Sequence, residues 1–131
     1  MDVKIFENAN CISAIYKDSI PKFQDIEIVK LIVLPGEDVE LILSIETKEL
    51  PKEMPSKWIE REVNAIQFVL DFIGVKNIKY NITDGCSCFF QVENLKNNCH
   101  KIIVKNKFSN KELSFEARWI YIKNIVALST E

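Results

Sequence analysis

Histidine is the side chain on which most acid–base and nucleophilic chemistry depends, and this sequence contains one, His100. A Ser/His/Asp or Cys/His arrangement would have to use it as the base. It follows a polar segment, residues 97–99, and no nucleophile-elbow motif accompanies it. The three glycines are scattered along the chain, which excludes a glycine-rich phosphate loop. We therefore expect no catalytic residue and no cofactor.

The cysteines offer the clearest metal-binding pattern, because Cys86 and Cys88 would share one face of a strand. A neighbouring strand or loop that brought Cys99 and His100 alongside would complete a tetrahedral set of ligands. Against this, zinc-binding cysteines are usually separated by about two to four residues, and cysteines on strands are commonly small buried hydrophobic residues. The favoured interpretation is structural, with no bound metal, and a metal site at these four residues is the alternative.

Paired carboxylates are the remaining candidates for chemistry. Glu60 and Glu62 flank Arg61, but acid–base work would require a shaped cleft that separates their pKa values. A solvated face or a contact with a partner is the favoured interpretation. Trp58, which follows a segment rich in proline, is either an aromatic contact of the kind that dominates protein interfaces or a lid over the core. The predicted partner contacts are therefore Trp58, Glu60 and Glu62.

Length and composition favour a single domain over residues 1–131. Seventeen basic and nineteen acidic residues give a net charge of −2, whereas a nucleic-acid-binding domain normally carries a positive excess. No apolar run is long enough for a membrane helix, and the N-terminus lacks the apolar segment of a signal peptide. We expect a cytoplasmic protein that binds neither nucleic acid nor membrane, and whose cysteines are thiols.

Alternation of apolar and polar residues dominates the chain and predicts strands. It is clear over residues 39–45 and 112–122, and the run 25–34 forms a hairpin with the first of these through Pro35-Gly36. Strands are also expected near residues 63–72, 78–82, 86–92 and 101–105, and for the first of these a helix is the less favoured alternative. In this pattern Phe68, Phe72, Phe115 and Trp119 are expected in the core.

Helical spacing is limited to two short stretches, residues 8–17 and about 56–62. The predicted fold is mostly β, α+β at the margin: an antiparallel sandwich or open barrel of about six to eight strands with a short N-terminal helix. Such closure or pairing of sheets hides the edges of the strands.

Three segments together resemble the bacterial immunity protein 50 family. Residues 21–28, Pro-Lys-Phe-Gln-Asp-Ile-Glu-Ile, look like its opening motif P-x-F-H-D-A-E-V. Residues 66–78 are similar to its strand-G-V-x-x-L segment, and residues 112–119 resemble its closing S-F-x-A/C strand. The likeness runs in order from about Asn8 to Ile125. One departure is Gln24, where the family has histidine, since glutamine forms hydrogen bonds but does not titrate.

The resemblance implies a cytoplasmic antitoxin-like protein that neutralises the catalytic domain of a cognate polymorphic toxin by binding it. Inhibition of this kind needs a stable scaffold and a complementary surface, and a mildly acidic chain would suit a basic toxin. The alternative is a β domain that binds a small ligand or a metal through Cys86, Cys88, Cys99 and His100. The sequence does not indicate the oligomeric state.

Overall fold

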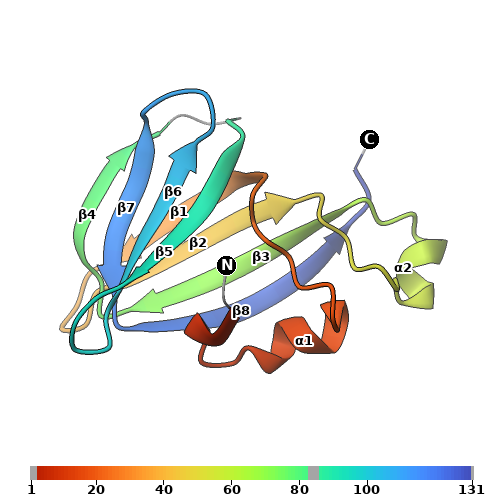
Figure 1. Cartoon of the computed structure of the whole chain (residues 1–131), viewed down its shortest axis with the longest axis horizontal. Coiled ribbons are helices and arrows are strands. Elements are labelled where there is room, and N and C mark those ends of the chain that lie inside the picture. The colour runs from red at the N-terminus through yellow and green to blue at the C-terminus, as the bar shows by residue number, and fades with distance from the viewer. Residues whose placement is uncertain (1–2, 83–85, 131) are drawn as a thin grey trace.

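Eight strands and three short helical segments make up the computed structural model, which describes residues 3–82 and 86–130 (Figure 1). The helical segments are a 3-10 helix η1 (Val3–Ile5), α1 (Asn10–Tyr16) and α2 (Ser56–Glu60). The strands are β1 (Ile26–Leu34), β2 (Glu40–Thr47), β3 (Ala65–Ile73), β4 (Lys76–Asn81), β5 (Cys88–Asn94), β6 (His100–Asn106), β7 (Glu112–Ala117) and β8 (Trp119–Leu128).

The strands form a single antiparallel sheet in the order β4-β7-β6-β5-β1-β2-β3-β8. Its two halves, β4-β7-β6-β5 and β1-β2-β3-β8, meet where β5 pairs with β1 through Ile26 and Cys88. Figure 1 shows the strands of the first half running steeply across the direction of β2, β3 and β8. The predicted mostly-β class, strand number and N-terminal helix are confirmed, and the sheet is open, not divided into two packed sheets.

The inner side of this bent sheet holds the core. Directly paired residues of a sheet point to the same side, and the rows Ile28-Ile45-Phe68-Ile125 and Val33-Leu41-Phe72-Ile120 point inward. The two halves touch through aromatic rings: Phe72 meets Phe115 of β7 edge to face, with ring centroids 4.7 Å apart. The core therefore joins both halves into one packed unit.

The N-terminal segment covers this inner side and protects one edge of the sheet. Ile12 and Tyr16 of α1 are buried, and the Tyr16 ring lies 6.1 Å from that of Phe68. The side-chain amide of Asn8 forms two hydrogen bonds with the backbone of Ile122, as a neighbouring strand would. Its Nδ2 donates to the carbonyl of Ile122 and its Oδ1 accepts from the N–H of Ile122, each at 2.8 Å. Part of the β8 edge is thereby closed to strand pairing.

One core prediction is wrong. The alternation over residues 112–122 placed Trp119 on the same face as Phe115, but the chain bends at Arg118 between β7 and β8. The N–H of Arg118 donates to the carbonyl of Ile73, so the chain leaves β6 and continues against β3. This residue breaks the two-residue period, so Ile120 turns inward and Trp119 is left 38% exposed.

Gly74 lies beside this bend, where the chain leaves β3 for β4. Its φ is +72°, in the region that glycine adopts without penalty. A Cβ at this position would lie 3.2 Å from the Cβ of Arg118. The chain passes between the two halves of the sheet twice, from β3 to β4 and from β7 to β8. These two connections approach each other closely at Gly74, where a side chain would be crowded.

The side of the sheet opposite the core differs between the two halves. In β1-β2-β3-β8 it carries the rows Glu27-Glu46-Gln67-Val126, Ile32-Ile42-Asp71-Tyr121 and Leu34-Glu40-Ile73-Trp119, and we name it the acidic face. In β4-β7-β6-β5 it carries the rows Glu93-Lys101-Glu116-Lys76 and Phe89-Lys105-Glu112-Asn81, and we name it the balanced face.

Candidate protein-binding surface

The three partner contacts expected from the sequence lie on and just after α2. Trp58 is partly buried and packs against the core, as a lid would. Glu60 and Glu62 are exposed, and Glu62 has a φ of 54° where the chain turns toward β3. Figure 1 shows α2 projecting from the sheet near the ends of β2 and β8. The structure therefore groups the three residues in one segment, with the two carboxylates available to solvent.

The metal site proposed as an alternative is wrong, because one hairpin separates its four residues. Cys88 pairs with Asn106 at one end of the β5–β6 hairpin, and Asn94 pairs with His100 at the other. Six strand residues span roughly 20 Å, so Cys86 and Cys88 lie far from Cys99 and His100. Among the described residues no group of His, Cys, Asp or Glu is placed to hold a metal ion.

The individual side chains of this hairpin have local partners. The His100 ring lies with its Nδ1 3.0 Å from Oδ1 of Asn94, across the same hairpin end. Cys88 is buried, and burial raises the pKa of its thiol to about 11, with smaller contributions from Cys86 and Glu27. A thiol in this environment stays protonated at neutral pH, which opposes its use as a nucleophile or metal ligand.

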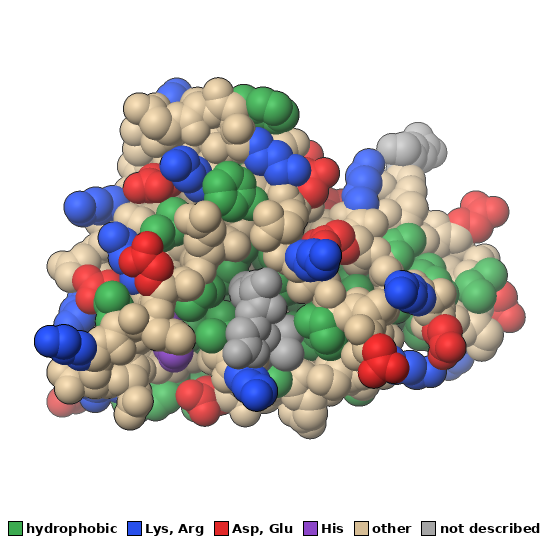
Figure 2. Space-filling view, viewed as in Figure 1, with side chains coloured by type: hydrophobic (Ala, Val, Ile, Leu, Met, Phe, Trp, Pro, Cys, Tyr) green, Lys and Arg blue, Asp and Glu red, His purple; other side chains and the backbone are tan. Residues whose placement is uncertain are grey.

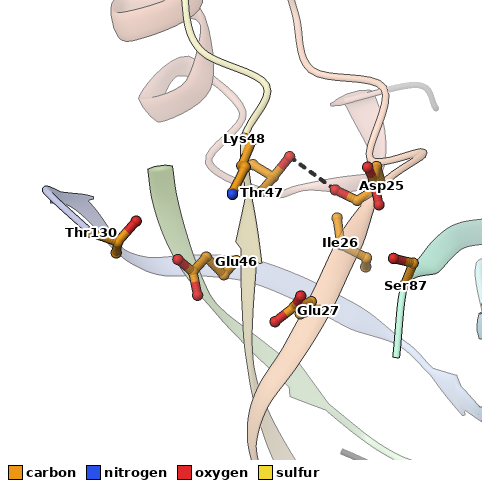
Figure 3. A pocket seen from close by; sticks show the side chains of 8 residues that line it. All are labelled: Asp25, Ile26, Glu27, Glu46, Thr47, Lys48, Ser87 and Thr130. Carbon is orange, nitrogen blue, oxygen red and sulfur yellow. Dashed lines mark hydrogen bonds between the residues drawn. The ribbon is translucent and has the colours of Figure 1, made fainter. Parts of the chain in front are cut away.

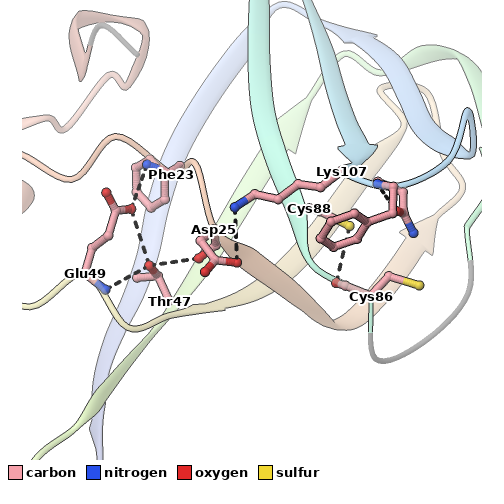
Figure 4. A network of polar contacts seen from close by, with 9 residues as sticks. Phe23, Asp25, Thr47, Glu49, Cys86, Cys88 and Lys107 are labelled. Carbon is pink, nitrogen blue, oxygen red and sulfur yellow. Dashed lines mark hydrogen bonds and ion pairs between the residues drawn. The ribbon is translucent and has the colours of Figure 1, made fainter.

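The opening motif is held by a carboxylate that follows β2. The Glu49 carboxylate accepts hydrogen bonds from the N–H groups of Lys22 and Phe23, at 3.0 and 2.8 Å. Phe23 adopts a φ of 52° and is buried, with its ring 5.1 Å from that of Phe68. Figure 4 shows how this network places Asp25 at the start of β1. Gln24, at the position of the family histidine, is exposed.

Tyr16 and Thr47 complete this network. The Tyr16 hydroxyl donates to the carbonyl of Glu49 at 2.7 Å, and burial together with the Glu49 carboxylate raises the pKa of the phenol. The Thr47 hydroxyl donates to the carbonyl of Asp25 at 3.3 Å and accepts from the N–H of Glu49 at 3.1 Å. Lys107 of the β6–β7 connection lies 3.6 Å from the Asp25 carboxylate, so the ion pair links the two halves of the sheet (Figure 4).

A shallow depression of about 480 Å³ lies at this end of the acidic face. Asp25, Glu27 and Glu46 line it together with Lys48 and Thr130. Figure 3 shows Glu27 and Glu46 on neighbouring strands, where the register pairs them directly. Like charges placed directly opposite each other destabilise a sheet, so this pair is not explained by the needs of the fold.

A second pair of carboxylates, missed at the level of sequence, lies at the opposite end of the acidic face. Asp71 of β3 pairs with Ile42, and Glu40 is two residues away on the same side of β2. The Asp71 Oδ1 is buried and has no hydrogen-bond partner among the described residues. Burial raises the pKa of Asp71 above its ordinary range, Glu40 adds to this through its charge and a side-chain hydrogen bond, and Lys123 partly offsets the effect. The available signal was one acidic residue between Leu70 and Phe72, at an outward position of a predicted strand.

In the view of Figure 2, Lys and Arg side chains are interspersed with Asp and Glu, and hydrophobic side chains form separate small areas. Within residues 3–82 and 86–130, no helix is long and apolar enough to span a membrane.

The fold and these surfaces define a mostly-β protein built on one open antiparallel sheet, with its core on the inner side. A sequence profile described as Immunity protein 50 matches residues 8–128, so the chain belongs to the immunity protein 50 family. The family resemblance of the sequence segments is thereby confirmed, and membership implies a role in toxin neutralisation. The comparisons with curated proteins and with solved structures gave no match.

Proposed function

We propose that this protein neutralises a cognate polymorphic toxin by binding it directly, in a fixed stoichiometry and without chemistry of its own. The observation that carries the proposal is the family match over residues 8–128. The partner is a toxin domain encoded beside the gene of this protein, and the complex forms where the protein is made, in the cytoplasm.

The physical character of the chain supports this function. An inhibitor that acts by binding needs a rigid scaffold, because a preordered surface avoids the entropy cost of ordering on association. Here one aromatic core connects both halves of the sheet, and the Glu49 network fixes the segment that leads into β1. The single histidine is engaged with Asn94, and the Cys88 thiol is held protonated by burial. These features favour recognition over catalysis.

Co-expression with the neighbouring toxin domain tests the neutralising role. We expect cells that produce both proteins to grow, and cells that produce the toxin with an unrelated β domain to stop growing. Purification through a tag on the toxin should recover the immunity protein in a 1:1 complex. Rescue without a recoverable complex would contradict direct binding.

Titration of toxin activity separates binding from catalysis. A stoichiometric inhibitor abolishes the activity at one equivalent and leaves a proportional remainder below it. An enzyme that modified the toxin would instead inactivate an excess of toxin over time. Inactivation at one-hundredth of an equivalent would therefore overturn the proposal that this protein has no chemistry of its own.

Contact of the partner with Trp58, Glu60 and Glu62 remains part of the proposal. The exposed positions of Glu60 and Glu62 support it, whereas Trp58 has less free surface because it packs on the core. The double variant Glu60→Gln/Glu62→Gln should lower the association rate with the toxin, since charges at the margin of an interface act mainly through steering. An unchanged rate at low salt would remove these two residues from the interface.

A further inference from the structure

Within residues 3–82 and 86–130, no further layer covers the apolar side chains that four neighbouring strands carry on the acidic face. The register places Ile42 beside Asp71 and Tyr121, and Ile73 beside Trp119. Trp119 and Tyr121 are 38% and 37% exposed. The helix α1 packs on the other side of the sheet, where Tyr16 meets Phe68. Exposed apolar and aromatic side chains grouped on one surface mark an interaction site.

Carboxylates predominate among the charges on this face, and several of them lie next to one another. The register places Glu27 opposite Glu46 and sets Glu40 beside the row of Asp71. Among the described residues of this face, Lys30 supplies a positive charge, Lys123 lies near Asp71, and Lys48 lines the depression beside Glu27 and Glu46. The four carboxylates therefore outnumber the cations that lie among them. A buried carboxylate oxygen without a partner is costly, and an incoming cation would relieve that cost.

A depression at the border of the face could receive a side chain of the partner. It has a volume of about 290 Å³ and adjoins Trp119, and its charged lining residues are Glu37 and Asp38 of the β1–β2 turn together with Lys76 and Arg118. The ring of Trp119 already has the Arg118 guanidinium 5.5 Å from its centroid. Glu37, Asp38 and the Trp119 ring offer a cationic side chain of the partner an ion pair and an aromatic surface, for which Lys76 and Arg118 are the local competitors.

We propose that the acidic face binds a basic, partly apolar surface of the toxin, with a lysine or arginine of the toxin placed against Asp71 and Glu40 and with Trp119 as the aromatic anchor. The inference rests on the proposed function and adds the surface and the chemistry of the partner. A second copy of this chain is the less suitable occupant, because two acidic faces in contact would bring like charges together.

Matched variants test the proposal against the neighbouring toxin domain. Asp71→Asn/Glu40→Gln removes the two charges at nearly constant volume and should weaken binding at least about tenfold. Trp119→Ala should weaken it about 30-fold, the loss typical of an interface anchor. The controls are Glu112→Gln, a carboxylate of the balanced face, and Phe108→Ala, an aromatic residue that is 85% exposed on the β6–β7 turn. Both controls should bind like the wild type.

Each outcome is decisive when thermal unfolding shows that the variants are folded. Weakened binding by the acidic-face variants with intact controls supports the proposal. A neutralising wild type whose acidic-face variants bind equally well overturns the inference and leaves the proposed function standing. A wild type that neither binds nor neutralises the toxin overturns both. A homodimer that Trp119→Ala dissociates, with toxin binding unchanged, would assign the face to a second copy and overturn the proposal.

Discussion

Both outward faces of the sheet carry charged side chains, but the charges are paired across the strands in different ways. On the balanced face the register alternates the sign across four strands, as in the row Glu93-Lys101-Glu116-Lys76. On the acidic face Glu27 lies opposite Glu46, and Asp71 lies among Ile42, Tyr121 and Ile73. Opposite charges across strands stabilise a sheet, and like charges destabilise it.

This difference shows that the composition of the whole chain does not reveal how the charges are distributed between the two faces. The net charge of −2 and the mixed sequence suggest an even surface. In one half of the sheet, however, carboxylates pair directly with lysines across strands, and in the other half Glu27 pairs with Glu46 and Asp71 pairs with Ile42 and Tyr121. Features that reduce stability without serving the fold are expected at functional sites. The contribution of cross-strand ion pairs to stability explains the charges of the balanced face. The charges of the acidic face are better explained by the binding of a partner.

The largest expected effect comes from removing the core that both faces share. Phe72→Ala deletes a ring that is fully buried and contacts Phe115 across the two halves. We expect a loss of about 3–5 kcal/mol in the free energy of unfolding. Urea unfolding followed by tryptophan fluorescence and by circular dichroism should show one shared transition. Two separate transitions would mean that the halves are independent units, and Phe108→Ala is the control with little expected change.

A smaller loss is expected where the two halves cross. Gly74→Ala forces a non-glycine residue to a φ of +72° and places its Cβ 3.2 Å from the Cβ of Arg118. The free energy of unfolding should fall by about 1–3 kcal/mol. Gly36→Ala is the matched control, since its nearest neighbour would be 3.8 Å away in the β1–β2 turn. Equal stability of the two variants would show that the crossing tolerates side chains.

The pH dependence of stability sharpens the comparison between the faces. A carboxyl group whose pKa is raised in the folded protein stabilises it below the ordinary pKa, and this contribution is lost as the pH rises through the raised value. Asp71 is in this position. Asp71→Asn should therefore lower the dependence of melting temperature on pH between about 4 and 7 and leave the free protein at least as stable at pH 7. Glu112→Gln, on the balanced face, should keep the wild-type profile.

The smallest effects should differ in sign between the two faces. Glu46→Gln relieves the repulsion with Glu27, whereas Lys101→Gln removes the cation between Glu93 and Glu116. The first change should raise the free energy of unfolding and the second should lower it, each by about 0.2–1 kcal/mol. Chemical denaturation at low ionic strength measures both, and added salt should reduce the difference. Effects of the same sign would refute the contrast.

Much of the fold was accessible from the sequence because strands with one buried face alternate clearly. The sequence predicted the strand over residues 39–45, the strand containing Phe68 and Phe72, and a helix over residues 8–17. The structure confirms all three, with the helix at Asn10–Tyr16. The exposure of Trp119 could not be predicted from the sequence. The bend at Arg118 adds one residue to the alternation, so every later side chain of the strand points to the opposite side of the sheet. That bend depends on a hydrogen bond to Ile73, far away in the sequence.

The candidate surface was less accessible, since it is defined by register. Nothing in the sequence places Glu27 opposite Glu46 or Asp71 next to Tyr121; these pairs appear only when the strands are aligned. The cysteine pattern failed for the same reason, because the β5–β6 pairing sets Cys88 and His100 at opposite ends of a hairpin. Carboxylates near Trp58 were prominent in the sequence simply because they are neighbours along the chain.

The pairing of β3 with β8, which follows it by more than forty residues in the chain, has a consequence for how the protein is made. The pairs Asp71-Tyr121 and Ile73-Trp119 assemble only after residues 119–128 have left the ribosome. Until then β3 lacks one neighbour, and the acidic face lacks both of its exposed aromatic side chains. A nascent chain therefore presents no finished surface to the toxin. Under the proposed mechanism this face can bind the toxin only after β8 has paired with β3, so slow synthesis or pairing of residues 119–128 would delay protection.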